Sequence, residues 1–389
     1  MQVRIAEPFY RRKVRQVQEQ LKARGLDGLF LHNHVQLYYL FGFFHYPCER
    51  PLIGFIPQEG EPALFVPRLE ADQVQECWVK DVEVYFEYPG TIHPLGWICS
   101  RLAARGYAQA RLGFEQSLAV ANLERVQEAL PEAQWVGAGD IVAGLRLRKD
   151  PEEIALIRKA GEYADYMLEE GVRYVRERGL GATELQVNNH VNQAVVDKMV
   201  SELDEVIFVA GVSGGLVCSG PRSALAHGLP TKKRLQRGES LILSFACFVG
   251  GYFAESERVF FLGEPTPEQA RYYEVEREAQ EVGVRAVQPG IPCSEANRIC
   301  LDVIRQAGFG EYIKHRMGHG VGMQNHEPPW IEDGDSTILR PGMAISCEPG
   351  VYVPGFGGFR ISDTLIVTED GAERVTSFPR TLESAILRV

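Results

Sequence analysis

The spacing of apolar and polar residues divides the chain into a first part of short alternating elements and a second part of longer ones. Residues 8–24 carry apolar side chains at helical spacing, and residues 69–79 and 118–129 predict two further helices. Short apolar runs predict strands at residues 28–31, 52–57, 63–67 and 82–86. This alternation is typical of one α/β domain.

The charged stretch LRLRKDP, residues 145–151, precedes a long helical pattern and predicts a boundary between two domains. The first domain comprises residues 1–147 and the second residues 148–389. Asp150 is expected to cap the helix that Pro151 begins. Helices are predicted at residues 151–178, 183–201, 266–287 and 294–307, and strands at residues 206–210, 343–347, 350–353 and 363–368. Strands gathered around a few long helices predict an α+β fold for this domain.

Residues 238–261 predict a long β-hairpin that turns at Gly250-Gly251. Glu255 and Glu257 are two residues apart on the returning strand, so both side chains point to one face of the sheet. Two such carboxylates repel each other and persist near an apolar hairpin only with a cation, a metal ion or bound protons. The alternative is that this face meets water and the acids are ordinary surface residues.

Composition limits the classes of partner. The 389-residue chain has a formal net charge of −11, which argues against nucleic acid because phosphate binding needs a basic surface. Its eight cysteines are scattered without a C-x-x-C pair, the N-terminus lacks the apolar core of a signal peptide, and no apolar run reaches the length of a membrane span. We therefore expect a cytoplasmic protein without a membrane partner.

Polar residues recur where loops and strand ends are predicted. His227 stands between apolar residues and a glycine, His319 stands between two glycines, and Glu348 ends a predicted strand. Packing explains a histidine between glycines poorly, because glycine allows close approach of the backbone and does not fill a core. Arg50, at a loop-to-strand edge, can bind a carboxylate, although pairing with Glu49 in solvent is the commoner case.

In several motifs the chain resembles the pita-bread fold hydrolases, which include creatinase, aminopeptidase P and prolidase. The motifs are HGLPT at residues 227–231, GHGVG at 318–322, HEP at 326–328, EPG at 348–350 and GGFRISDT at 357–364. The resemblance implies a C-terminal pita-bread domain preceded by a smaller α/β domain of the creatinase type.

The peptidase members of this family hold two metal ions with two Asp, one His and two Glu. By the resemblance, these positions fall on Ser244, Glu255, His319, Glu348 and Ser362. Two hydroxyls thus replace two carboxylates, and a dinuclear centre needs bridging carboxylates. The sequence therefore predicts no cofactor. The alternative is a single divalent ion bound by Glu255, His319 and Glu348.

The hairpin is similar to that of creatinase, which works without metal. By this resemblance Glu257 and Glu348 grip a cationic guanidinium of the substrate, His227 transfers a proton and His319 lies in the pocket. Glu255 and His326 are further substrate-binding candidates. Arg50 would bind the substrate carboxylate in the neighbouring subunit, which implies a homodimer.

The resulting prediction is a metal-independent creatinase-like hydrolase that cleaves a C–N bond in a small zwitterion with a guanidino, amidino or amide group. One alternative is a Xaa-Pro dipeptidase or aminopeptidase with a reduced metal site. Another is a non-catalytic binding protein of the same fold.

Overall fold

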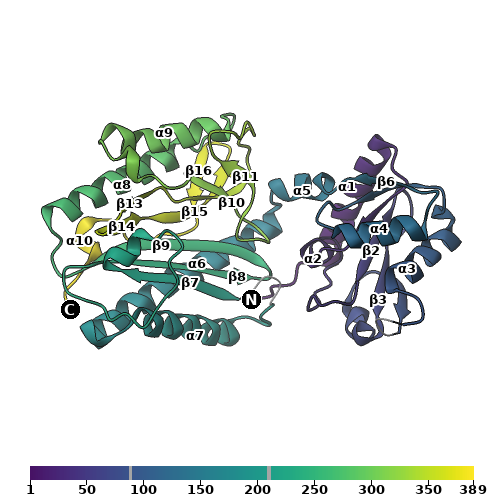
Figure 1. Cartoon of the computed structure of the whole chain (residues 1–389), viewed down its shortest axis with the longest axis horizontal. Coiled ribbons are helices and arrows are strands. Elements are labelled where there is room, and N and C mark those ends of the chain that lie inside the picture. Colours follow the sequence, from purple (N-terminus) through teal and green to yellow (C-terminus); the bar gives the residue numbers. More distant parts are fainter. Residues whose placement is uncertain (87–89, 208–211) are drawn as a thin grey trace. The chain divides into compact units, whose positions relative to one another are not determined.

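The computed structural model describes residues 1–86, 90–207 and 212–389 (Figure 1). The chain divides into two compact units, one of residues 4–146 and the other of residues 1–3 and 147–389. Among the described residues, no helix combines the length and the apolar character that crossing a membrane requires.

The unit of residues 4–146 is built on a sheet in which six described strands follow the order β4-β3-β2-β1-β5-β6. The strands are β1 (Gly28–Leu31), β2 (Ile53–Pro57), β3 (Ala63–Pro67), β4 (Asp81–Tyr85), β5 (Arg111–Phe114) and β6 (Gln134–Gly137). The helices are α1 (Glu7–Arg24), α2 (His34–Phe41), α3 (Pro94–Leu102), α4 (Val120–Ala129) and α5 (Asp140–Leu147). Strands and helices alternate as expected for an α/β domain.

One predicted helix of this unit does not form. Residues 69–79 contain two short 3₁₀ turns, at Arg68–Glu70 and Gln73–Glu76. Leu69 is 71% exposed whereas Val74 is buried, so the segment lacks the continuous apolar face that holds an amphipathic helix against a core. The sequence pattern also missed α2, α3, α5, β5 and β6, whose apolar runs are short or broken by polar residues.

The second unit contains a larger sheet, whose described strands follow the order β11-β10-β12-β15-β9-β8-β7. These are β7 (Ser213–Ser219), β8 (Ser240–Val249), β9 (Tyr252–Leu262), β10 (Gly318–Gly320), β11 (Glu327–Ile331), β12 (Ala344–Cys347) and β15 (Ser362–Thr368). Strand β16 (Gly371–Arg374) pairs with β15, β17 (Ile386–Leu387) pairs with β9, and β13 (Gly350–Val353) pairs with β14 (Gly357–Arg360). The predicted strand at 206–210 falls largely on residues 208–211, which lie outside the described residues.

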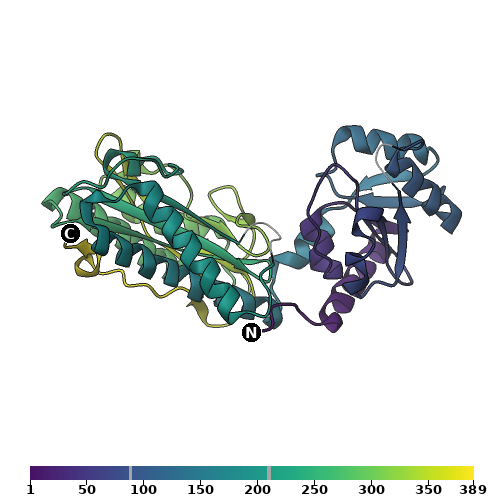
Figure 2. The ribbon, with the colours of Figure 1, turned by 90° about the horizontal axis from the view of Figure 1, so that it is seen from below.

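Long helices cover this sheet. Helices α6 (Pro151–Arg178) and α7 (Glu184–Glu202) lie beside each other against β7, β8 and β9 (Figure 2). Asp150 caps α6 as expected, and its N–H donates to Glu153 at 2.8 Å. Helices α8 (Pro267–Ala286) and α9 (Cys293–Gln306) pack together and share an apolar core with β8, β9 and β15, and a short helix, α10 (Leu382–Ala385), follows. The α+β prediction for this unit is confirmed.

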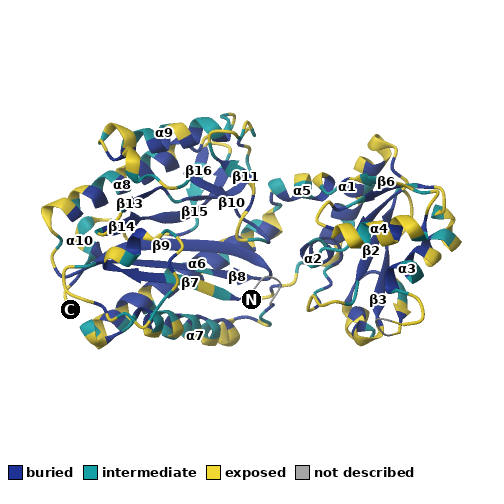
Figure 3. Ribbon diagram, in the orientation of Figure 1, coloured by how far each residue is buried: buried dark blue, intermediate teal, exposed yellow. Residues whose placement is uncertain are grey.

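The hairpin β8–β9 is buried along its length (Figure 3). Its strands join through Gly250 and Gly251, whose φ angles of 55° and 83° are ones that only glycine adopts readily. In the register, Ser244 lies opposite Glu257 and Ala246 lies opposite Glu255. Directly opposed residues share a face, so this pairing places both carboxylates and the Ser244 hydroxyl on one side of the sheet.

Candidate functional site

A cavity of about 440 Å³ opens on this face of the hairpin. Its size lies in the range of small-molecule sites. Ser244, Glu255 and Glu257 line its floor, and Phe248 and Phe253, whose ring centroids are 5.1 Å apart, form an apolar wall. The remaining lining residues are Ser213, Gly214, Gly215, Leu216, His227, Ala246, Asn325, His326, Glu348 and Arg360.

His319 and Glu348 approach the Glu255 carboxylate from neighbouring strands. His319 lies on β10, and an ideal Cβ on the glycines beside it would come within 2.1 Å of Ser346 O and 2.4 Å of Pro328 O. Glycine is therefore required on both sides of His319 for the strands to approach. Glu348 directly follows β12, and its N–H donates to Met317 O at 2.7 Å, which fixes the carboxylate at the strand end.

Glu255, His319 and Glu348 form a compact donor cluster. One ligand-type atom from each lies within 4.8 Å of the others. Nδ1 of His319 lies 3.1 Å from the carbonyl of Gly320, an arrangement in which Nδ1–H donates and Nε2 faces the cluster. Nε2 lies 2.9 Å from a Glu348 oxygen, yet it has no partner of hydrogen-bond geometry among the described residues. A buried nitrogen oriented in this way is typical of a metal ligand.

Burial and mutual charge set the protonation of this cluster. Burial raises the pKa of Glu255 to about 8, and the charge of Glu348 adds to the rise. Burial opposes ionisation of Glu348, but His319 outweighs it and lowers the pKa of Glu348 to about 2. Burial likewise disfavours charged His319, but Glu348 and Glu255 outweigh it and raise its pKa to about 9. At neutral pH without metal, Glu255 is therefore a neutral carboxylic acid and His319 is a positively charged imidazolium.

Glu257 is held by a cation of the chain itself. Nε and Nη2 of Arg360, at the end of β14, donate to the two oxygens of the Glu257 carboxylate, and the Ser244 hydroxyl donates to the same group. Nη1 of Arg360 donates to Tyr352 Oη at 3.0 Å, and Tyr352 Oη lies 2.7 Å from Nε2 of His315. Both charges of the pair are buried, with side-chain exposures of 3% and 6%.

Ser362, like Ser244, contributes a hydroxyl where the resemblance places a carboxylate in the peptidases. Ser362 begins β15 directly opposite Glu257 in the register, and its hydroxyl donates to Glu255 at 2.9 Å. Neither Ser244 nor Ser362 adds a negative charge to the pocket. Each instead satisfies an oxygen of a neighbouring glutamate.

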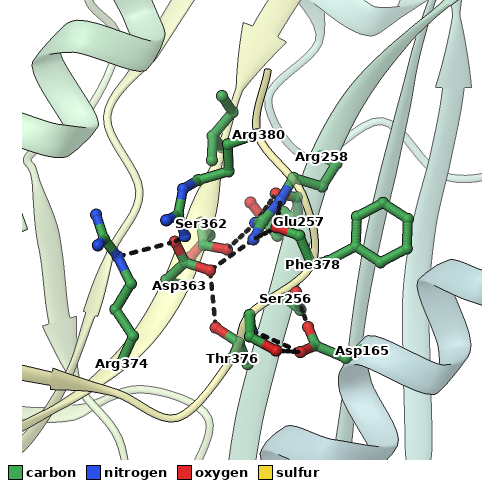
Figure 4. Close-up of polar contacts among 12 residues, drawn as sticks. Asp165, Ser256, Glu257, Arg258, Ser362, Asp363, Arg374, Thr376, Phe378 and Arg380 are labelled. Carbon is green, nitrogen blue, oxygen red and sulfur yellow. Dashed lines mark hydrogen bonds and ion pairs between the residues drawn. The ribbon is translucent and has the colours of Figure 1, made fainter. Parts of the chain in front are cut away.

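A buried ion cluster supports these strands from behind (Figure 4). Nη1 of Arg258 donates to the carbonyls of Glu257 and Ser362 at 2.7 and 2.8 Å, and its Nη2 donates to Asp363 at 2.7 Å. Asp363 also accepts from Arg380 at 2.8 Å. Arg258 thus joins β9 to β15 at the register that places Glu257 beside Ser362.

The structure brings together six of the seven residues that the sequence singled out. Glu255, Glu257 and Glu348 line the first cavity, and His319 lies beside Glu348. His227 and His326, both exposed, line this cavity and a second one of about 340 Å³ that also includes His315, Arg316, His319, Glu332, Glu348 and Arg360. The His326 ring lies 3.8 Å from that of His319, and burial, reinforced by His319, lowers the pKa of His326 to about 4.

Arg50 lies in the other unit, before β2, where its Nη1 donates to Glu49 at 2.7 Å. Its predicted role at a neighbouring active site stays a prediction. Conversely, sequence reasoning assigned no role to Arg360, Tyr352 or His315. An arginine in the otherwise apolar run GGFRI was the available signal for Arg360.

Comparison with known proteins identifies the family. Residues 155–369 match the model of metallopeptidase family M24, and residues 13–148 match the creatinase/prolidase N-terminal domain. The chain belongs to metallopeptidase family M24. This confirms the resemblance to the pita-bread family, the two-domain α+β architecture and the assignment as a hydrolase of carbon–nitrogen bonds.

Three solved structures of the family are similar over nearly the whole chain. Dipeptidase PepE from Mycobacterium ulcerans is 30% identical with a TM-score of 0.87, and the match covers 99% of this chain and 100% of that one. The prolidase from Pyrococcus horikoshii OT3 is 28% identical (TM-score 0.83, 95% and 99% covered). The Xaa-Pro dipeptidase from Bacillus anthracis is 28% identical (TM-score 0.85, 97% and 100% covered).

These comparisons correct two predictions. Metal-independent, creatinase-like hydrolysis is wrong, because the family is a metallopeptidase family and the similar structures are those of dipeptidases and prolidases. The physical reason lies at Glu257: Arg360 supplies its cationic partner, so the pocket does not need a guanidinium from the substrate. The prediction of no cofactor is wrong for the same family reason, and Glu255, His319 and Glu348 converge as metal ligands do.

The donor set fits one divalent ion and does not fit two. Two carboxylates and one imidazole are donors that Zn²⁺, Mn²⁺ and related ions accept. A second ion would need bridging carboxylates where Ser244 and Ser362 supply only hydroxyls. Glu257, the other carboxylate that lines the cavity, is already bound to Arg360 on both oxygens.

Proposed function

We propose that this M24 protein is a dipeptidase that hydrolyses Xaa-Pro or related short peptides with one divalent ion held by Glu255, His319 and Glu348. The convergence of these three donors within 4.8 Å of one another carries this proposal, and two of them, Glu255 and Glu348, line the 440 Å³ cavity. The similarity to a dipeptidase, a prolidase and a Xaa-Pro dipeptidase supports the substrate class.

Each side chain has a definable task in such a reaction. A divalent ion in this cluster supplies Lewis-acid polarisation of the peptide carbonyl. His227, exposed and shared by both cavities, is placed to deliver a proton to the leaving nitrogen. His326, neutral because of its lowered pKa, can accept a hydrogen bond from a substrate N–H. Phe248 and Phe253 offer an apolar surface to a pyrrolidine ring.

The test is turnover of Ala-Pro, Gly-Pro and Ala-Ala by protein that has been stripped with chelator and reloaded with Mn²⁺, Co²⁺ or Zn²⁺. We expect hydrolysis by the loaded protein, none by the stripped protein, and none by Glu348→Gln. Undiminished hydrolysis after complete removal of metal would refute the proposal. Absence of turnover with every metal and peptide would instead favour a binding protein with the same pocket.

We further propose a homodimer in which Arg50 reaches the partner's site, and a cytoplasmic location. The eight cysteines, all among the described residues, are free thiols, which supports a reducing compartment. For Arg50→Ala we expect a KM for Ala-Pro raised at least tenfold with kcat nearly unchanged. Sedimentation measures the assembly, and a fully active monomer would exclude this arrangement.

A further inference from the structure

The pocket contains a fixed positive charge, the guanidinium of Arg360, and this side chain lines both cavities. Two of its N–H groups bind Glu257, and Nη1 binds Tyr352 at 3.0 Å and the Ala226 carbonyl at 2.8 Å. A guanidinium has five N–H groups. One on Nη2 therefore has no hydrogen-bond partner among the described residues and is available to a ligand.

Counting formal charges distinguishes one bound ion from two. Glu255, Glu257 and Glu348 contribute −3 when ionised, Arg360 contributes +1, and His319 is neutral when it acts as a ligand. One divalent ion brings this sum to zero. A second would leave +2 in a largely buried pocket, and uncompensated buried charge is strongly unfavourable.

We propose that Arg360, anchored by Glu257, takes the place of a second metal ion, so that the pocket binds one divalent cation and its guanidinium binds an oxygen of the substrate. The substrate part of this inference rests on the proposed peptidase function, because the carbonyl and carboxylate oxygens of a short peptide are the acceptors that a guanidinium recognises. The stoichiometry part rests only on the charges and contacts of the pocket.

The first test measures bound metal. Stripped protein is loaded with excess Mn²⁺, desalted and analysed by inductively coupled plasma mass spectrometry. We expect one ion per chain in the natural protein. In the double variant Ser244→Asp/Ser362→Glu, two added carboxylates change the one-ion charge from 0 to −2, so we expect two ions.

The outcomes separate this inference from the proposed function. Two tightly held ions in the natural protein would overturn the inference and leave the peptidase proposal intact. A natural protein that holds one ion and yet hydrolyses none of the peptides would overturn the peptidase proposal and leave the stoichiometry part intact. A double variant that folds and still binds one ion would show that the hydroxyls do not limit the stoichiometry, which also counts against the inference.

The second test concerns substrate recognition. The double variant Arg360→Gln/Glu257→Gln removes both charges, so no buried carboxylate is left unpaired and the one-ion pocket stays neutral. We expect one bound Mn²⁺ with a dissociation constant within about threefold of the natural value, and kcat/KM for Ala-Pro lowered by about 10²–10³-fold. Arg158→Gln, which removes an arginine from an exposed pair with Glu373, is the matched control and should change neither quantity.

Normal kcat/KM in the Arg360→Gln/Glu257→Gln variant would show that Arg360 only supports the fold. Loss of Mn²⁺ together with activity would show that it supports the metal site and not the substrate. If this variant fails to fold, Arg360→Lys keeps the charge and tests the same point. Lysine cannot reproduce the two-pronged contact with Glu257, so we expect one ion and an intermediate loss of kcat/KM.

Discussion

At the scale of single residues, the donor cluster stores two protons when no metal is bound. Glu255, with a pKa of about 8, and His319, with a pKa of about 9, are both protonated near neutral pH, whereas Glu348 is ionised. Glu255 and His319 can serve as ligands only after losing these protons. A divalent ion therefore replaces two protons, and the charge of the pocket does not change.

This exchange predicts a steep pH dependence of metal affinity. Below pH 8 two protons must leave for each ion, so affinity for Mn²⁺ should rise by up to about 100-fold per pH unit and level off above pH 9. Titrations at pH 6, 7 and 8 against a competing chelator measure the slope. Calorimetry in two buffers of different ionisation enthalpy counts the released protons, and a value near zero at pH 7 would contradict the assignment.

His227 provides a second prediction at this scale. Its side chain is exposed, so replacement should not disturb a core. We expect the His227→Ala variant to have the same melting temperature as the natural protein and to bind one metal ion. Its kcat should fall by about 10²–10⁴-fold, which is the usual contribution of a general acid. Thermal unfolding and kinetics on the same sample decide this. A lower melting temperature with normal kcat would mean that His227 has only a structural part.

At the scale of elements, the site depends on how closely five strands approach one another. Strand β10 passes between β11 and β12 with glycines where side chains would collide, and β9 meets β15 only at Glu257–Ser362 and Ser256–Asp363. Arg258 bridges this short contact through two backbone carbonyls and Asp363. Asp363 therefore positions the strands that carry Glu257 and Ser362.

Asp363→Asn should be strongly destabilising. Asp363 is fully buried, and its neutralisation leaves the buried Arg258 guanidinium without a counter-charge, whereas Arg374 and Arg380 still pair with Glu281. We expect a loss of about 3–5 kcal/mol in the free energy of unfolding, measured in urea. The control Glu373→Gln breaks an exposed pair with Arg158 and should cost about 0–1 kcal/mol. Equal losses in the two variants would contradict this account.

At the scale of the whole molecule, each unit has an apolar core of its own. The donor cluster lies entirely in the unit that contains residues 147–389. Any ligand of the folded state stabilises the structure that holds it. Metal should therefore act on one of the two units.

We expect two calorimetric transitions, of which metal raises only one. At a free Mn²⁺ concentration 100 times the dissociation constant, the unit of residues 147–389 should gain about 2.7 kcal/mol, and the unit of residues 4–146 should gain nothing. Glu348→Gln is the control, because it removes a ligand and should abolish the shift. If Mn²⁺ moved both transitions together, the two units would unfold as one.

Local patterns were enough to predict much of this molecule. The two-residue spacing of Glu255 and Glu257 placed them on one face because side chains alternate along a strand. Gly250-Gly251 marked the turn, Asp150-Pro151 marked the start of α6, and the glycines around His319 marked a close approach of strands. These features depend only on neighbouring residues in the chain, so the sequence alone predicts them. The motifs of the sequence also predict the family.

The chemistry of the pocket was decided only by tertiary structure. No local pattern shows that Arg360 reaches back across 103 residues to neutralise Glu257, and without that contact the crowded carboxylates predict a cationic substrate. Nor does the sequence show that Glu255, His319 and Glu348, from β9, β10 and the end of β12, come within 4.8 Å of one another. Charge balance in a buried site depends on every group that packs against it, so it is known only when the strands are in place.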